Sequence, residues 1–480
     1  MQPRFRLLAG GACSSLGRGD AAKRSVTIGA KEVGIAVPGQ PFGSAGPDPE
    51  PGTTGRFLVL LDQDDLSSGT IAVERAADVR IADMADLPAG TTKAPKGADG
   101  ILFPELGVAV VDVAPGARAG LQAVAMENSA VHVVEAERYV HATALLAPSM
   151  GQSYLEGYRD AVNALVNNLI PASNGRAERM VGERVPGERA VLSWDESQLA
   201  WGLQAIGVPE SAFSGRGVKV AILDTGIDLG HPDFAGRDIT SQSFIPGQDV
   251  QDVLGHGTHV AGTACGRRQP TVLPRYGVAY NADLFVGKVL SNSGSGTDGQ
   301  IIAGINWAIT NGCRVVSMSL GAPVDVGTPP STVFENVAQR ALAKGTLIIA
   351  AAGNESSRSQ GKISPVGHPA NCPSIMAVAA IDEAFGIADF SCGSRNPNGG
   401  EVNIAGPGVN VHSSWPMPTQ YRRIMGTSMA TPHVSGVAAL LAEAKPDISA
   451  ADLARLLEST AKPLPPLPVS DVGAGLVQAP

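Results

Sequence analysis

The stretch G-V-K-V-A-I-L-D-T-G-I-D, residues 217–228, contains an apolar run that ends abruptly at Asp224. A run of this kind is typical of a strand that is covered on both faces in a parallel sheet. Four more short β-rich runs follow, at 282–290, 314–320, 346–353 and 374–381. Helical patterns separate several of them, as at 299–311 and 333–345. We therefore predict an α/β fold in which helices cover both faces of a mostly parallel central sheet.

Four polar side chains occupy the positions at which such a sheet presents its functional groups, the carboxyl ends of the strands. Asp224 follows the first strand, and Asn354 follows the strand in T-L-I-I-A-A-A-G. The motif G-H-G-T-H-V-A-G (255–262) leads from a Gly-rich turn into a helix at His256. The motif G-T-S-M-A-T-P-H-V-S-G (426–436) begins a helix near Ser428, with Pro432 expected in its first turn. We expect these side chains to meet at one edge of the sheet.

Together these residue types suit nucleophilic catalysis. A serine hydroxyl attacks a carbonyl only when a neighbouring imidazole takes its proton, and a carboxylate fixes the tautomer of that imidazole. An amide N–H from Asn354 and the backbone N–H of Ser428 would stabilise the oxyanion that forms.

Two other interpretations compete with this one. Ser428 alone could be a helix cap. His256 and His259 could bind a metal, although no carboxylate stands between them as in H-E-x-x-H.

Composition limits the class of protein. The 480 residues are sufficient for one large and one smaller domain. A net charge of −9 argues against nucleic acid or an anionic membrane as the main partner. No run approaches the ~18 apolar residues of a membrane span. The start of the chain is basic and then apolar, but its apolar part is too short and too interrupted by glycine for a convincing signal peptide, so the compartment stays open.

The chain divides into four predicted segments by composition and pattern. Residues 1–55 are rich in Gly, Pro and Ser and are predicted to be a disordered leader. Residues 56–142 show a small α+β pattern, with strands at 56–62, 108–113 and 130–137 and a helix at 116–125. Residues 143–199 are predicted to be a linker with one amphipathic helix at 153–169, and residues 200–480 form the large domain.

The five cysteines, an odd number without a C-x-x-C pair, predict neither a disulfide framework nor a zinc ribbon.

The order Asp, His, Ser, within D-T-G-I-D, H-G-T-H-V-A-G and G-T-S-M-A-T-P-H-V-S-G, resembles the subtilisin-like serine peptidases, the subtilase family. A-A-A-G-N-E is a fourth matching motif, and the match runs from about 200 to 480. The resemblance implies a serine endopeptidase with Asp224, His256 and Ser428 as triad and Asn354 in the oxyanion hole. It also implies that residues 56–142 are a ferredoxin-like prodomain.

The resemblance also implies a groove for a peptide substrate. Its two edges would be Gly294, Ser295 and Gly296 on one side and Ser319, Leu320 and Gly321 on the other, with the peptide added between them as a strand. The G-S-G-T-D-G pattern at 294–299 imitates a dinucleotide fingerprint, but the next strand ends without the required acid. Gly321 and Gly367 would line the pocket for the residue before the scissile bond. Because neither is charged, we expect broad specificity that favours apolar residues.

Four further expectations follow from the resemblance. Asp298 and His368 stand where the family usually has bulkier or aromatic residues. Asp233 matches a calcium-ligand position, but the loop G-R-R-Q-P-T-V-L-P-R-Y (266–276) offers no Asn or Asp, so we expect no high-affinity calcium site there and no required cofactor. Cys372 and Cys392 would lie side by side and would form a disulfide in an oxidising compartment; the alternative is two reduced, partly buried thiols.

The prodomain is expected to inhibit the enzyme and to be removed by a first cut in cis, within 142–149 or, as second choice, within 172–195. The alternative is an attached domain that is never cut.

The expected function is thus a self-processing serine endopeptidase that acts on proteins or peptides as a monomer. The resemblance favours an extracellular location. The alternative from another class is a catalytically silent peptide-binding protein on the same scaffold. The intact set of triad residues favours activity.

Overall fold

The computed structural model describes residues 52–87, 91, 94–142 and 193–480. Nearly all of the predicted leader, most of the predicted linker and the predicted helix at 153–169 lie outside these residues. The first strand, β1, begins at Thr53, slightly ahead of the predicted domain start at 56. The described chain comprises an N-terminal unit (52–142) and a core domain (193–480).

A seven-stranded sheet in the order β14-β13-β12-β10-β6-β8-β7 forms the centre of the core domain. All neighbouring strands in it run parallel, as the sequence predicts. The sequence did not predict β7 and β14, because β7 is largely polar and β14 is only a short apolar run. The strands are β6 (Lys219–Asp224), β7 (Ile239–Ser243), β8 (Asp283–Lys288), β10 (Val315–Met318), β12 (Leu347–Ala351), β13 (Met376–Ile381) and β14 (Ile404–Pro407).

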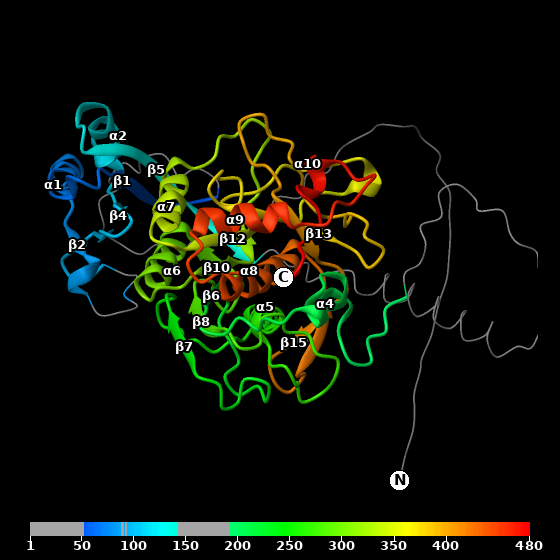
Figure 1. The fold of residues 1–480 in the computed structure, drawn as a ribbon. Coiled ribbons are helices and arrows are strands. Elements are labelled where there is room, and N and C mark those ends of the chain that lie inside the picture. Colours follow the sequence, from blue (N-terminus) through cyan, green and yellow to red (C-terminus); the bar gives the residue numbers. More distant parts are fainter. Residues whose placement is uncertain (1–51, 88–90, 92–93, 143–192) are drawn as a thin grey trace, which may run out of the picture. The chain divides into compact units, whose positions relative to one another are not determined.

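Helices cover both faces of this sheet, so the predicted three-layer arrangement is confirmed. Figure 1 shows α6 and α7 on the side that faces the N-terminal unit, and α5 and α8 on the opposite side. The helices are α5 (His256–Cys265), α6 (Asp298–Thr310), α7 (Thr332–Ala343), α8 (Thr427–Ala444) and α9 (Ala450–Ser459).

Small residues allow α5 and α8 to pack closely. A Cβ added to Gly436 of α8 would lie 2.5 Å from the Cβ of Val278 and 3.0 Å from the carbonyl oxygen of Ala264 in α5. Both helices are buried almost all round, as is typical of helices in the core of a large domain. A core with few aromatic side chains is therefore filled by backbones that approach closely.

The N-terminal unit is a mostly antiparallel sheet in the order β5-β1-β4-β3-β2 with two helices. The prediction of a small α+β unit is confirmed in outline, although α1, β2 and β3 were not predicted individually. The elements are β1 (Thr53–Leu61), α1 (Leu66–Ala77), β2 (Ile81–Asp83), β3 (Gly100–Phe103), β4 (Val108–Asp112), α2 (Arg118–Glu127) and β5 (Val131–Ala142).

The two faces of this small sheet are both apolar. Phe57, Val59 and Leu61 of β1 pack in the unit's own core, whereas Leu58 and Leu60 belong to the large core shared with the core domain. Because side chains alternate along a strand, one continuous apolar run supplies both faces. The unit therefore needs the core domain to cover its second face.

The remaining elements are short. No helix in the described parts of the chain is long and apolar enough to span a membrane. The elements are α4 (Trp201–Ala205), β9 (Ser295–Thr297), β11 (Leu320–Gly321), β15 (Val411–Ser414), β16 (Tyr421–Ile424), α10 (Val469–Val472) and the 3₁₀ turns Met84–Asp86, Pro115–Ala117, Val208–Glu210 and Arg358–Gln360.

Candidate active site

Asp224 and His256 form a buried hydrogen-bonded pair. Asp224 is the last residue of β6, and His256 is the first residue of α5. Nδ1 of His256 lies 2.7 Å from Oδ1 of Asp224. A carboxylate can only accept, so Nδ1 carries a proton, and in the neutral ring Nε2 is the acceptor nitrogen. Nε2 is buried and has no hydrogen-bond partner among the described residues.

The charges around His256 favour its protonated form. Burial alone would lower the pKa of His256, but the charge of Asp224, its hydrogen bond and the charge of Asp252 outweigh burial and raise the pKa. Asp252, which sequence reasoning did not single out, also fixes the first turn of α5. Its Oδ2 accepts from the backbone N–H of Thr258 at 2.8 Å, and its Oδ1 accepts from the Thr225 hydroxyl at 2.9 Å.

Ser428 lies in the first turn of α8, but it is not the helix cap. The cap position is Gly426, with φ of 155°. The Ser428 hydroxyl donates to the carbonyl oxygen of Ser319 at 3.1 Å, and the Ser319 hydroxyl donates to the carbonyl oxygen of Ser428 at 2.8 Å. The capping interpretation of Ser428 is therefore wrong.

Pro432 lies beyond the first turn of α8, contrary to expectation, because the helix begins at Thr427. In an α-helix the N–H of residue 432 would donate to the carbonyl of Ser428. Proline has no N–H, so the Ser319 hydroxyl supplies the missing donor.

Asn354 follows β12, and its side chain is anchored to the start of α8. Oδ1 of Asn354 accepts from both the backbone N–H and the hydroxyl of Thr427, each at 2.9 Å. This anchoring directs the Nδ2 donors of the amide away from Thr427. The preceding Gly353 adopts φ of 113°, which favours glycine.

The sheet register brings these groups to one edge. Leu223 of β6 is paired with Met318 of β10, so Asp224 and Ser319 are the next residues on two neighbouring strands. Ser428 is bonded to Ser319, and Asn354 follows the strand on the other side of β10. The four residues predicted from the sequence thus come from the same end of β6 and β12 and from the starts of α5 and α8, and Ser319 after β10 lies between them.

Strand β5 of the N-terminal unit lies between the two expected edges of a peptide groove. It pairs antiparallel with β9 on one side and with β11 on the other. Its last residue, Ala142, lies opposite Leu320 and donates its N–H to the carbonyl oxygen of Gly294 at 2.9 Å. His141 lies opposite Gly321, and its Nδ1 is 2.9 Å from the hydroxyl of Ser295. A Cβ on Gly367 would lie 2.7 Å from the carbonyl oxygen of Ala322, directly after β11.

Comparison with known proteins identifies the family. The subtilase family model matches residues 215–475. Subtilisin DY of Bacillus licheniformis is 41% identical over 260 residues, which cover 54% of this chain and 89% of that protein. Subtilisin of Bacillus pumilus is 41% identical over 268 residues (55% and 91%), and the alkaline protease of Alkalihalobacillus alcalophilus is 39% identical over 296 residues (61% and 72%). The chain belongs to the subtilase family. It is a serine endopeptidase, a hydrolase that acts on proteins.

The second histidine of the subtilase motif, His259, has a structural role. Its Nε2 lies 3.0 Å from the carbonyl oxygen of Val411. Burial, with the neighbouring His256, lowers the pKa of His259 to about 3. No group of three or more His, Cys, Asp or Glu side chains suited to a metal occurs in the described ranges. The His256–His259 metal interpretation has no support.

Asp233, the candidate calcium ligand of this subtilase, is occupied by hydrogen-bond donors. Oδ1 accepts from the N–H and the hydroxyl of Thr271 at 2.6 and 2.8 Å. Oδ2 accepts from the hydroxyls of Tyr276 and Tyr421 at 2.6 and 2.9 Å. Calcium requires six to eight oxygen ligands, whereas this carboxylate faces four donors. The residues present therefore do not fit a calcium ion at Asp233.

Of the two alternatives for Cys372 and Cys392, the structure contradicts the disulfide and has the reduced thiols, because both cysteines are free. Sγ of Cys372 lies 3.6 Å from the carbonyl oxygen of Ser331, whereas Sγ of Cys392 lies 3.1 Å from Oε2 of Glu355. Burial raises the pKa of both thiols, that of Cys392 to about 12. Each cysteine is thus a buried, unreactive side chain.

Proposed function

We propose that this subtilase hydrolyses peptide bonds through an Asp224–His256–Ser428 triad and an acyl-enzyme, and that it is made as a self-processing zymogen. The observation that carries the proposal is the Asp224–His256 hydrogen bond of 2.7 Å at the strand edge that also holds Ser428. Asn354 and the backbone N–H of Ser428 are the proposed oxyanion donors.

The geometry supports a sequence of proton transfers. Nε2 of His256 accepts the proton of the Ser428 hydroxyl as that oxygen attacks the carbonyl carbon of the substrate. Asp224 stabilises the imidazolium that forms. The tetrahedral oxyanion is stabilised by donors that are already oriented, and His256 then gives its proton to the leaving amine.

The N-terminal unit is the proposed inhibitory prodomain. Besides occupying the groove with β5, it caps two helices of the core domain. Glu137 accepts from the N–H of Gly299 in the first turn of α6 at 3.0 Å, and Glu135 accepts from the N–H of Thr332 in the first turn of α7 at 2.7 Å. Carboxylates at helix N-termini are favourable because they satisfy unpaired N–H groups and the helix dipole.

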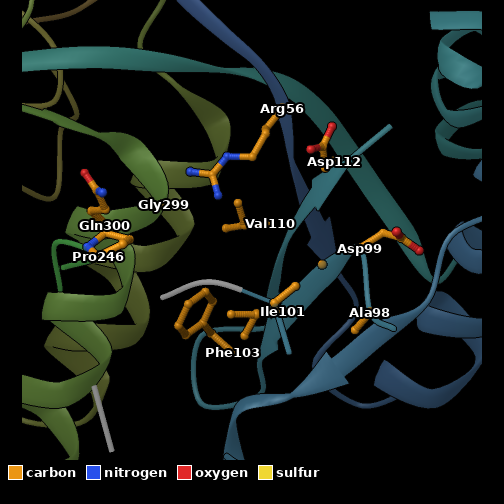
Figure 2. A pocket seen from close by; sticks show the side chains of 12 residues that line it. Arg56, Ala98, Asp99, Ile101, Phe103, Val110, Asp112, Pro246, Gly299 and Gln300 are labelled. Atoms are coloured by element: carbon orange, nitrogen blue, oxygen red, sulfur yellow. The ribbon is translucent and has the colours of Figure 1, made fainter. Parts of the chain in front are cut away.

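These polar caps matter because the interface beside them is incompletely packed. A cavity of about 420 Å³ lies between the sheet of the N-terminal unit and the start of α6. Figure 2 shows Arg56 reaching from the N-terminal sheet toward Gly299, beside Val110. The same Arg56 binds Glu137 through Nη2 at 2.6 Å, which fixes the capping carboxylate. Docking therefore depends on β5 and the two caps, together with the apolar face of the small sheet that contains Leu58 and Leu60.

The register supports a specific place for the first cut. Leu320 lies opposite Ala142, so Ser319 is the residue that corresponds to position 143. Because the Ser428 hydroxyl is bonded to Ser319, we propose that the enzyme cleaves the bond between Thr143 and Ala144. Residue 143 itself lies outside the described residues. The uncharged Gly321 and Gly367 support a broad preference for small or apolar residues before the cut.

A catalytically silent peptide-binding protein is the competing function, and a fluorophosphonate probe distinguishes the two. The probe phosphonylates only an activated serine, so wild type should be labelled. Ser428→Ala should not be labelled. Asn354→Ala, which keeps the nucleophile, should be labelled more slowly, because one oxyanion donor is worth about 10²–10³ in rate. Unlabelled wild type, or label that persists in Ser428→Ala, would contradict the proposed triad.

A further inference from the structure

The two edges of the substrate groove are joined by a buried side-chain pair. Asp298 directly follows β9, one edge of the groove. His368 pairs with Ala322, which directly follows β11, the other edge. Nε2 of His368 lies 2.9 Å from Oδ1 of Asp298. The pair thus links the two strands between which the peptide lies.

This pair is fully enclosed in the described structure. The side chains of His368 and Asp298 are 2% and 0% exposed. The ring of His368 packs edge-on against Phe334 with centroids 4.7 Å apart. Nδ1 of His368 is buried without a hydrogen-bond partner in the described ranges. The one hydrogen bond of the His368 ring in the described ranges is therefore that of Nε2 to Asp298, and it orients the Asp298 carboxylate.

The second oxygen of Asp298 holds the peptide strand itself. Oδ2 accepts the backbone N–H of Arg138 at 2.9 Å. Arg138 is the sixth residue before the proposed scissile bond, counted back from Thr143. The neighbouring N–H of Tyr139 points elsewhere, to the carbonyl oxygen of Gly52 within the N-terminal unit. A core-domain group therefore accepts the backbone N–H of residue 138, whereas the N–H of residue 139 is accepted within the N-terminal unit.

We infer that Asp298, oriented by His368, is a substrate-binding residue that accepts the backbone N–H of the sixth residue before the cleaved bond. Its role rests on the proposed function, because it assumes that substrates lie in the groove as β5 does. A carboxylate acceptor makes a stronger hydrogen bond than a neutral carbonyl. The ligand is an extended peptide with at least six residues before the cleaved bond. Because the contact is to the backbone, the side chain of the sixth residue can be of any type.

A backbone contact is tested by removing the backbone N–H. The substrate is an internally quenched peptide with the sequence E-R-Y-V-H-A-T-A-L-L, which is that of residues 137–146. In one analogue an ester oxygen replaces the N–H of the residue corresponding to Arg138. The matched control carries the ester at the position of Tyr139. Processed wild-type enzyme, freed of its N-terminal unit, is assayed with all three peptides.

The ester at position 138 should lower kcat/KM by about 10- to 100-fold, the usual effect of losing a hydrogen bond to a charged group. The ester at position 139 should change it by less than about three-fold, because no core-domain group accepts that N–H. In Asp298→Ala the ratio of kcat/KM for the amide peptide to kcat/KM for the 138 ester should fall to about one. This variant keeps the Thr297–Gln300 capping box of α6, so the helix start retains its own cap.

Three results would contradict the inference. Equal cleavage of all peptides by wild type would show that the N–H is not bound, while leaving the proposed function intact. An unchanged ester penalty in Asp298→Ala would assign the acceptor to another group. An enzyme that cleaves none of the peptides would overturn the proposed function and with it the role of Asp298.

Discussion

Ser319 and Ser428 exchange two hydrogen bonds, one from each hydroxyl to the other's carbonyl oxygen, at 2.8 and 3.1 Å. The exchange is possible because Pro432 cannot donate to the Ser428 carbonyl within α8. The proline thus leaves the carbonyl of Ser428, the proposed nucleophile, available for a contact with Ser319. Ser319, the residue before β11, thereby holds Ser428 at both its hydroxyl and its carbonyl oxygen.

This exchange predicts a rescue between two sites. Ser319→Ala removes the hydroxyl that donates to the buried Ser428 carbonyl and should lower the free energy of unfolding by about 1–3 kcal/mol. Adding Pro432→Ala restores an N–H to α8, so the double variant should regain most of the loss. Urea unfolding of the single and double variants, each with Ser428→Ala to prevent self-digestion of the protein, measures both effects. Additive losses would show that the two sites are independent.

The pH dependence of catalysis should report the raised pKa of His256. Only the neutral imidazole accepts a proton, so kcat/KM should rise with pH, with its inflection above the ordinary value of about 6.5. Asp252→Asn removes a negative charge that favours the imidazolium and should move the inflection to lower pH.

The control for this profile is Asp249→Asn. Asp249 is exposed and is not among the charged residues that raise the pKa of His256. Rate profiles of the three enzymes on one peptide provide the measurement. An inflection below pH 5 in wild type would indicate a carboxylate base in place of His256.

The sequence predicts the catalytic edge because its signals are local. The apolar strand before Asp224, the Gly-rich turn before His256 and the small residues around Ser428 are each readable within a dozen positions, and the parallel sheet then brings them together. Asp252 carried no such signal. Its carboxylate acts on Thr225 and Thr258 from a loop without a motif, and only the fold brings these groups into contact.

Contacts between residues that are far apart in the chain likewise could not be predicted from the sequence. Glu137 caps a helix whose contacted residue, Gly299, lies 162 positions further along the chain. The wrong disulfide has the same origin, since resemblance placed Cys372 and Cys392 side by side while local packing directs their thiols to Ser331 and Glu355. Hydrophobic pattern fixes which segments form strands, whereas side-chain partners depend on the three-dimensional arrangement of those segments.

Self-processing should occur at a single bond. If Ser428 acts on the strand that follows Ala142, the mature chain should begin A-L-L-A-P, from Ala144. The cut is intramolecular, so its rate should not depend on protein concentration. N-terminal sequencing during a dilution series tests both points, and Ser428→Ala should stay at 49.0 kDa. A first cut within 172–195 would contradict the register, and two intact chains with active wild type would remove the prodomain proposal.

If the N-terminal unit is cleaved off as a prodomain, as proposed, its retention by the core domain should depend on the two helix caps. Glu135→Gln removes a charge that faces the start of α7, and Glu137→Gln does the same at α6 and weakens the tie to Arg56. Each charge-assisted contact contributes about 1.5–3 kcal/mol, so each variant should bind its prodomain at least about ten-fold more weakly.

Co-elution of the cleaved fragment with the enzyme, and the activity recovered on dilution, measure this retention. Glu127→Gln is the matched control, because Glu127 is exposed at the end of α2. Equal retention in all variants would show that β5 and the shared apolar core hold the unit in place without the caps.

The hydrogen-bond network of Asp233 should make the stability of this region independent of calcium. Burial alone would raise the pKa of Asp233, but hydrogen bonds from Tyr276, Thr271 and Tyr421 outweigh it and lower the pKa. A carboxylate with a lowered pKa stabilises the folded state above its unfolded pKa of about 3.9, and this contribution is lost as the pH falls through the folded value. Asp233→Asn should therefore lower the melting temperature at pH 7, and the difference from wild type should shrink below about pH 4.

The measurement for Asp233 is thermal unfolding of Ser428→Ala proteins from pH 3 to 8, with either EDTA or millimolar calcium present. Tyr276→Phe is the matched variant, because it removes one donor and keeps the charge. It should lose about 1.5–3 kcal/mol of stability at pH 7, and this loss should shrink as the pH falls and Asp233 is protonated, with no response to calcium at any pH. A contrary result would be a calcium-dependent rise in the melting temperature of the protein that has Asp233 but not of Asp233→Asn. The carboxylate would then bind a cation in solution, and its four hydrogen-bond donors would have to turn away.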